Sequence, residues 1–437
     1  MQQIMIAGGA GFAGDRTDQA VQLAASGKVQ SIGLECLAER TLVPGLRARK
    51  LNPEAGADPR LRRRLMPLIP VALAAKCRLV SNMGAANPAA AGRQIAALAS
   101  ELGCRNLRVA SVVGDDVLAL AKFIDWQAPW QGDLLGAHAY LGADAMREAV
   151  FDGADIVITG RAADSALFSA PVLPILLDEL DALAGATTLG HLLECSGQVT
   201  GGNFELPDGS SLSAEEFANL GFPIAQVNAD GTAELQLLDG APGRVDALTC
   251  TLQLLYEVHD PNAYITPDAI LDFTGIQFDE LGNNWVRVSG ARHCGRPTRL
   301  KVSGFVEQPG LIADVEVGYA GTHALHRARV AADTLRLRLS DINSEDLRID
   351  LVGVDSTLGS ASLPAPNHLS EVRVHVSGRC ADAEMAQIIE DEVYALSLSG
   401  PAGAGSMRCE RRPNLAVVDG FIDRELVVTE TLWETAQ

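Results

Sequence analysis

The sequence of 437 residues lacks several patterns that mark specialised classes of protein. Its eight cysteines are scattered without a CxxC pair, which argues against a disulfide framework and a zinc site. The longest apolar stretches, residues 65–75 and 166–177, contain proline and are too short to span a bilayer. The N-terminus has no basic segment before its short apolar run, so we expect no signal peptide. These absences favour a cytoplasmic protein with reduced thiols and no membrane partner.

Positive charge and familiar catalytic motifs are also scarce. Lys and Arg total 35 against 55 Asp and Glu, and a net charge of −20 would repel nucleic acid and anionic membranes. No nucleophile elbow accompanies a Ser–His–Asp set, and no HExxH motif is present, so we expect neither a catalytic triad nor a bound metal. The chain also has no internal repeat and no low-complexity segment.

The length favours two domains with a boundary near residue 203. In residues 1–203, short apolar runs alternate with helix-like segments, which predicts an α/β domain with a mostly parallel, Rossmann-like sheet. Residues 204–437 are turn-rich and strand-rich, and we expect a second, α+β domain that closes over the first. There the sequence predicts a hairpin turn at residues 228–231, a strand at 247–258 and a helix at 322–339.

Six apolar runs in the first domain each end at glycine or at a polar group. Parallel strands deliver their carboxyl ends to one edge of an open sheet, where ligands bind. We therefore expect the polar residues at these ends to meet in one crevice, which is the arrangement that an enzyme requires. They are Glu35, Asn82, Asp115, His138, Arg161 and Asp164.

A glycine loop follows the first predicted strand. Gly9, Gly11 and Gly14 match G-x-G-x-x-G, and Glu35 stands at the end of the second strand, where a dinucleotide fold places an acidic residue. Asp15 follows directly, however, and its carboxylate would compete with a pyrophosphate for the loop N–H groups. A tight turn without a ligand, a simple anion site that also uses Arg16, and a dinucleotide site therefore stay open.

The other strand ends each have a structural and a functional interpretation. Arg161 suits bidentate binding of a carboxylate or phosphate, with Asp164 orienting it or capping the next helix; an internal ion pair explains both residues equally well. Asn82 is a candidate ligand contact. Asn87, also a substrate-binding candidate, precedes Pro88 and suits a helix N-cap. Asp115 or the next aspartate faces the crevice while the other caps a helix.

The segment from residue 191 to residue 204 combines titratable residues with a polar loop. His191 and Glu194 are three residues apart, so on a helix they share a face and suit an acid–base pair or a helix end. Cys195 lacks an elbow motif and is expected to be buried rather than nucleophilic. The loop that follows has the composition of a substrate-wrapping loop. Its candidate contacts are Thr200, Gly201, Gly202 and Asn203. Farther along the chain, His259 and Tyr264 would reach the crevice if the second region closes over it.

Seven of these segments, taken in order, resemble the acyclic terpene utilisation AtuA family. They are GGAGFAGDR, ECLAER, SNMGAANP, ITGRAADSAL, GHLLECSGQVTGGNF, VHDPNAYITPD and VGYAGTHALHRARVAA, between residue 4 and about residue 340. The resemblance implies a role in the catabolism of acyclic terpenes through carboxylate or acyl-CoA intermediates. Longer relatives append a small ferredoxin-fold domain, so the resemblance implies either a separate small partner subunit with that fold or none.

Three functions fit these observations. The leading hypothesis is a hydratase or other lyase without a redox cofactor, acting on a small carboxylate or an acyl-CoA. Arg161 and the loop amides would hold the anion. Glu194, Asp115 or Glu35 would act as general base, assisted by His191 or Asp164. The alternatives are an NAD(P)-dependent oxidoreductase with Glu35 on the ribose, and a non-catalytic subunit of a catabolic complex. We expect a homo-oligomer in each case.

Overall fold

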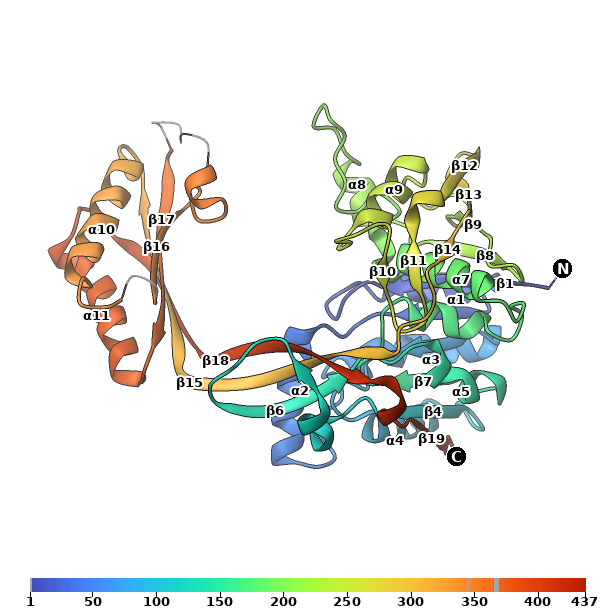
Figure 1. Ribbon diagram of the computed structural model, residues 1–437. Coiled ribbons are helices and arrows are strands. Elements are labelled where there is room, and N and C mark those ends of the chain that lie inside the picture. The colour runs from blue at the N-terminus through green and yellow to red at the C-terminus, as the bar shows by residue number, and fades with distance from the viewer. Residues whose placement is uncertain (1, 344–345, 363, 365–368) are drawn as a thin grey trace. The chain divides into compact units, whose positions relative to one another are not determined.

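The computed structural model describes residues 2–343, 346–362, 364 and 369–437, which form two compact units (Figure 1). Unit 1 comprises Met1–Ala128, Leu135–Gly304 and Val418–Gln437, and unit 2 comprises Pro129–Leu134 and Phe305–Val417. The boundary expected near residue 203 lies inside unit 1. The strands that follow it up to residue 289 therefore belong to the same unit as the N-terminal region.

Unit 1 is built on one ten-stranded sheet. In sheet order its strands are β12 (Gln277–Gly282), β13 (Trp285–Ser289), β9 (Ala233–Gln236), β8 (Ile224–Asn228), β1 (Gln3–Ala10), β2 (Ser31–Leu34), β3 (Arg78–Ser81), β7 (Ile156–Thr159), β4 (Arg108–Val113) and β19 (Glu430–Thr435). The five strands from β1 to β4 pair in parallel. The strands on either side of them pair antiparallel.

A mixed α/β fold is confirmed, but a mostly parallel Rossmann-like sheet is not. Four ladders of the large sheet are parallel and five are antiparallel. In the Rossmann order the first strand is central, whereas β1 here ends the parallel block and β7 lies between β3 and β4. The physical reason is that later strands complete the sheet through hydrogen bonds at its edges, which the apolar runs of residues 1–203 do not specify.

Helices cover both faces of this sheet. Neighbouring strand residues alternate between two cores: Leu79 and Ile156 pack with α1, α3 and α4, whereas Val80 and Val157 pack with α5, α6, α7 and α9. This alternation is the period-two pattern of a strand buried on both faces. The α-helices of unit 1 are α1 (Asp18–Ala25), α2 (Glu39–Leu51), α3 (Leu61–Ala75), α4 (Pro88–Glu101), α5 (Arg147–Phe151), α6 (Ala166–Ser169), α7 (Leu180–Glu194), α8 (Ala214–Ala218) and α9 (Ala247–Leu255). Within the described ranges, every helix is too short or too polar to cross a bilayer.

Shorter elements connect these layers. The short strands are β5 (Asp125–Trp126), β6 (Asp133–Ala139) and a three-stranded sheet of β10 (Tyr264–Ile265), β11 (Ile270–Asp272) and β14 (Arg292–His293). The 3₁₀ helices of unit 1 are η1 (Leu118–Phe123), η2 (Ala143–Met146), η3 (Ala170–Val172), η4 (Ser196–Gln198), η5 (Phe273–Gly275) and η7 (Arg424–Leu426), whereas η6 (Gly359–Ala361) belongs to unit 2. The fifth apolar run thus forms β6, which lies outside the parallel block and pairs with β15 (Arg299–Ala320).

Local turn and capping signals account for two sequence predictions with opposite outcomes. The hairpin at residues 228–231 is confirmed as the β8–β9 turn, where Gly231 has a φ of 82°. The strand at 247–258 is wrong, because residues 247–255 form α9. Asp246 caps this helix by accepting hydrogen bonds from the N–H groups of Leu248 and Thr249. The cap satisfies N–H groups that a helix start leaves without partners.

Unit 2 contains a β-α-β-β-α-β succession. Its elements in chain order are β15, α10 (Ala324–Arg338), β16 (Leu347–Val352), β17 (Glu371–Cys380), α11 (Ala383–Ser399) and β18 (Gly405–Asp423), with the sheet order β16-β17-β15-β18. This succession is the ferredoxin-like arrangement. Alternate residues of β15 and β17, among them Val315 and Val374, pack against the apolar faces of α10 and α11. The predicted helix at 322–339 is confirmed as α10, and a ferredoxin-like unit therefore exists within the chain itself.

Candidate active site

A cavity of about 500 Å³ lies in unit 1 where polar residues follow the strands β2 and β7. The glycine loop after β1, the end of α7 and residues 256–257 and 264–267 complete its lining, together with residues 297, 299–301 and 421. Enclosed cavities of this size with a few convergent polar groups are typical of small-molecule sites. The expected convergence of strand ends is therefore present for Glu35, Arg161 and Asp164, all of which line the cavity.

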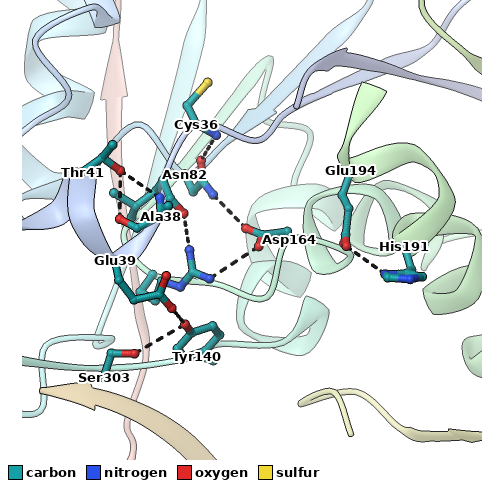
Figure 2. Close-up of polar contacts among 12 residues, drawn as sticks. Cys36, Ala38, Glu39, Thr41, Asn82, Tyr140, Asp164, His191, Glu194 and Ser303 are labelled. Atoms are coloured by element: carbon teal, nitrogen blue, oxygen red, sulfur yellow. Dashed lines mark hydrogen bonds and ion pairs between the residues drawn. The ribbon is translucent and has the colours of Figure 1, made fainter. Parts of the chain in front are cut away.

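Arg161 and Asp164 form the centre of the polar network in this cavity, and Figure 2 shows Asp164 beside Asn82. The Arg161 guanidinium donates to the carbonyl of Leu37 and to Asp164 Oδ2, at 3.4 Å in the second case. Its Cζ atom lies 4.1 Å from the ring centroid of Tyr140. Asn82, fully buried, accepts from the Cys36 N–H at 2.7 Å and donates to Asp164 Oδ1 at 3.3 Å. Asn82 thus orients Asp164 and is not itself part of the cavity lining.

Two carboxyl groups of the cavity favour their protonated forms. Burial raises the pKa of Asp164 to about 7, and the nearby carboxylates of Glu194 and Glu39 add to this effect, while the charge of Arg161 opposes it. Burial also raises the pKa of Glu35 well above its ordinary value, with further contributions from Asp164 and Glu194. Removal from water penalises the ionised carboxylate, and like charges increase that penalty. Asp164 is therefore able to exchange a proton near neutral pH, and the pKa of Glu35 is shifted in the same direction.

Glu194 enters the cavity from the last turn of α7 and is joined to His191, as its spacing predicts. The distance from Glu194 Oε1 to His191 Nδ1 is 2.8 Å, and His191 Nε2 lies 3.1 Å from the carbonyl of Leu254 (Figure 2). Because a carbonyl only accepts, Nε2 carries a hydrogen, and a second proton is shared between Nδ1 and Glu194. Burial alone would lower the pKa of His191, but Glu194 and the Leu254 carbonyl raise it. His191 itself is buried behind Glu194 against the rings of Tyr264 and Phe273.

Several residues of the cavity were not selected by the sequence analysis. Tyr140, which follows β6, donates its hydroxyl to Glu39 in the first turn of α2, and both line the cavity. The Tyr140 hydroxyl also accepts from Ser303 at 3.4 Å (Figure 2). The charge of Arg161 and the Tyr140 bond lower the pKa of Glu39 against the effect of its burial. The available signal was Glu39 in the ECLAER segment, four residues after Glu35.

A second group of lining residues comes from the region after α9. Tyr256 and Glu257 follow the helix directly, and Glu257 has a φ of 59°. Tyr264, expected at the crevice if this region closes over it, lines the cavity, and burial raises the pKa of its hydroxyl. His259 is exposed and is not among the lining residues. Cys195 also lines the cavity, and burial raises the pKa of its thiol, which therefore stays protonated at neutral pH.

The glycine loop is occupied by its own carboxylate. Asp15 Oδ2 accepts the N–H of Gly11 at 2.8 Å, and its Oδ1 accepts the N–H of Arg16 at 2.7 Å. These are the donors that a pyrophosphate would need. A Cβ on Gly11 would lie 2.6 Å from the Cys195 backbone, and one on Gly9 would lie 2.4 Å from Ile32. The glycines thus allow close packing of the loop, and of them only Gly11 lines the cavity.

Asp115 and His138 are brought to the same sheet edge but are enclosed in the protein. The Asp115 carboxylate accepts the N–H of Arg161 at 2.8 Å and lies 2.8 Å from His138 Nδ1. Asp115 is 2% exposed, and neither residue is part of the cavity lining. Its contacts fix the backbone at Arg161, from which the guanidinium reaches the cavity. The expected grouping of Asn82, Asp115 and Arg161 is therefore present, with Arg161 alone of the three facing the cavity.

The remaining candidate residues lie outside the cavity lining. Asn87 caps α4 by accepting from the Ala90 N–H at 3.2 Å, in agreement with its capping interpretation. Arg16 pairs with Asp18 and donates to the Ala218 carbonyl. The 200–203 loop packs on its own neighbours instead of lining the cavity. Its residues Thr200, Gly201, Gly202 and Asn203 contact the segments around Gly197 and Gly221 or the side chain of Gln198. Gly14 contacts Phe12 within its own loop.

The fold and cavity define a mixed α/β protein with a buried acidic site and an inserted ferredoxin-like unit. Among the residues that the structure describes, no group of three or more His, Cys, Asp or Glu side chains is arranged to hold a metal ion. The sequence model of the acyclic terpene utilisation family protein AtuA matches residues 4–432, so the chain belongs to the AtuA family. Neither the curated proteins nor the solved structures provide a significant match.

Proposed function

We propose that the cavity is the active site of a lyase that adds water to, or removes it from, a small unsaturated carboxylate or acyl thioester of acyclic terpene breakdown. One observation carries this proposal: Asp164 and Glu35, two carboxyl groups with raised pKa values, line the cavity beside Arg161. General acid–base catalysis requires groups that exchange protons near the working pH. Family membership supports the pathway, and the site chemistry supports the class of reaction.

The proposed hydration divides the proton transfers between two sides of the cavity. Glu194, held by His191, removes a proton from water while the water oxygen forms a bond to the β-carbon. The π electrons of the double bond move toward the substrate carbonyl, where the positive charge of Arg161 stabilises the developing enolate. The neighbouring carboxyl groups of Asp164 and Glu35 together deliver one proton to the α-carbon and regain it from solvent, while Glu194 releases to solvent the proton that it took from water. Dehydration follows the same steps in reverse.

This proposal is tested by incubating the purified full chain in D₂O with crotonate, longer methyl-branched homologues and their CoA thioesters. The expected result is deuterium at the α-carbon and a hydrated product, both detected by NMR. Glu194→Gln and Glu35→Gln should each reduce the rate roughly a hundred- to ten-thousand-fold. Asp239→Asn is the control, because this exposed carboxylate pairs only with Lys28 among the described residues. Full activity in Glu194→Gln would remove the assigned base.

The same preparation separates the alternative functions. Titration with NADH followed by fluorescence reports on the oxidoreductase alternative, which requires Asp15 to release the Gly11 N–H to a pyrophosphate. Saturable NADH binding that Asp15→Ala strengthens would favour that alternative over the lyase. A chain that binds none of the compounds and incorporates no deuterium would instead favour a non-catalytic subunit.

A further inference from the structure

The charges that line the cavity bear on which form of substrate the site accepts, and this inference rests on the proposed function. Acidic lining residues outnumber basic ones, with five carboxyl groups against three cations. The carboxyl groups belong to Glu35, Glu39, Asp164, Glu194 and Glu257, and the cations to Arg161, Arg299 and Lys301. Coenzyme A carries several phosphate charges, which proteins bind with Arg, Lys or free backbone N–H groups. The cavity lining instead has more acidic than basic side chains.

The basic residues of the lining are already engaged by the protein. Arg299 lies 2.9 Å from Asp125 Oδ2 and donates to the Phe421 carbonyl at 3.2 Å. Lys301 Nζ lies 3.4 Å from Asp419 Oδ1. A phosphate at this side of the cavity would compete with these carboxylates for the two cations, and it would also face their negative charge.

Another part of the lining is apolar and accessible to solvent. Phe12, Tyr256 and Ile265 are 56%, 37% and 65% exposed, respectively. Large apolar side chains that remain exposed at a cavity favour a ligand that covers them. They come from the glycine loop, from the end of α9 and from β10, so three separate segments contribute to one apolar rim.

We infer that the site accepts a free acyclic acid and not its CoA thioester, with the single carboxylate toward Arg161 and the apolar chain along Phe12, Tyr256 and Ile265. One negative charge is compatible with the cavity because burial favours the protonated forms of Asp164 and Glu35, which leaves the charge of Arg161 incompletely balanced. The length of the apolar chain, rather than a nucleotide handle, then provides the affinity.

Calorimetric titration of the full chain with crotonate, a longer methyl-branched homologue and the CoA thioester of each tests this inference. The free homologue should bind at least about tenfold more tightly than its thioester. Ile265→Ser should weaken the homologue several-fold and crotonate by less than about twofold, because only the longer chain reaches the rim. Ile388→Ser, at a half-exposed position on α11 in unit 2, is the matched control and should change neither.

The outcomes separate this inference from the proposed function. If the thioester binds more tightly, and the Arg299→Ala/Lys301→Ala double variant abolishes that binding, the inference is overturned while turnover of the thioester still supports the lyase. If Ile265→Ser weakens all ligands equally, the rim does not recognise the chain and the inference also fails. If no compound is bound or turned over, both proposals are rejected together.

Discussion

The open sheet face of unit 2 and the cavity of unit 1 both bring carboxylates next to basic side chains. In unit 2, Glu316 of β15 lies 2.7 Å from Arg373 of β17, and Asp314 lies 3.1 Å from His375. These residues alternate along their strands with the core positions that pack under α10 and α11. They therefore face away from the helices and pair across neighbouring strands, where the opposite charges of Glu316 and Arg373 balance.

In unit 1 the charged groups stand at strand and helix ends, and carboxyl groups exceed cations. Asp164 shares Arg161 with Glu35 and Glu39, and the salt-bridge distance from Arg161 to Asp164 is 3.4 Å. The two unit 2 pairs are closer than the Arg161–Asp164 pair, and each joins one carboxylate to one basic side chain. The difference teaches that pairing alone does not indicate function. An excess of buried carboxyl groups around a cavity does indicate a functional site, because it leaves protons available for exchange.

The largest expected effect on the reaction rate comes from comparing one isosteric substitution in unit 1 with one in unit 2. Asp164→Asn should reduce deuterium incorporation into the substrate roughly a hundred- to ten-thousand-fold, because the amide cannot exchange a proton with the substrate. Asp314→Asn, the matched change on the unit 2 sheet, should leave the rate within about twofold, since it lies outside the cavity lining. Both variants should keep the wild-type circular dichroism spectrum. Equal losses in the two variants would show that fold disruption, not proton transfer, explains the effect.

Strand-end reasoning predicted the part of the site that depends on local sequence. Glu35, Arg161 and Asp164 end or follow short apolar runs, and the parallel strands β2 and β7 bring them together. The same reasoning identified Glu194 through its helical spacing from His191. The positions of these residues agree with that reasoning because an apolar run followed by a polar group specifies a strand end, and parallel neighbours share one edge. Their roles in catalysis stay predictions.

What the sequence did not indicate depends on tertiary contacts. Tyr140 follows β6, which pairs with β15, more than a hundred residues away in the chain, and Glu257 follows a helix that was predicted as a strand. The antiparallel edges of the large sheet likewise require pairing between β1 and β8 and between β4 and β19. The sequence predicts Asp115 in the crevice because it follows an apolar run. A polar residue in that position gives the same pattern whether its side chain faces a cavity or is enclosed by the protein.

A buried anchor in unit 1 should be more important for stability than an ion pair in unit 2. Asp115→Ala removes the carboxylate that accepts the Arg161 N–H and contacts His138 Nδ1, and both partners are buried. Losing the acceptor of the buried Arg161 N–H together with the His138 contact should lower the free energy of unfolding by about 3 kcal/mol. Urea denaturation monitored by circular dichroism measures this value. A loss below about 1 kcal/mol would mean that Asp115 does not fix the strand end.

The raised pKa of Asp164 predicts how stability depends on pH. Between its ordinary pKa of 3.8 and its folded value of about 7, the folded chain binds one more proton at this site than the unfolded chain. The stabilisation of the folded chain by protonated Asp164 is therefore complete at low pH. It is lost as the pH rises toward and through 7, at about 1.4 kcal/mol per pH unit. Asp164→Asn should make the slope of unfolding free energy against pH less negative by about that amount between pH 5 and 6.5. An unchanged slope would show that Asp164 is ionised in the folded chain. Asp314→Asn provides the matched control from unit 2.

The smallest effect is expected for the paired charges of unit 2. A double-mutant cycle with Glu316→Gln and Arg373→Gln should give a coupling of about 0.5–1 kcal/mol, because both side chains remain partly exposed to solvent. The coupling should fall as salt is raised to about 1 M, where the screening length shortens to about 3 Å. Neither variant should alter turnover at the cavity. A coupling above about 2 kcal/mol would mean that the unit 2 face is as well removed from water as the unit 1 site, so that charge excess alone would distinguish the two regions.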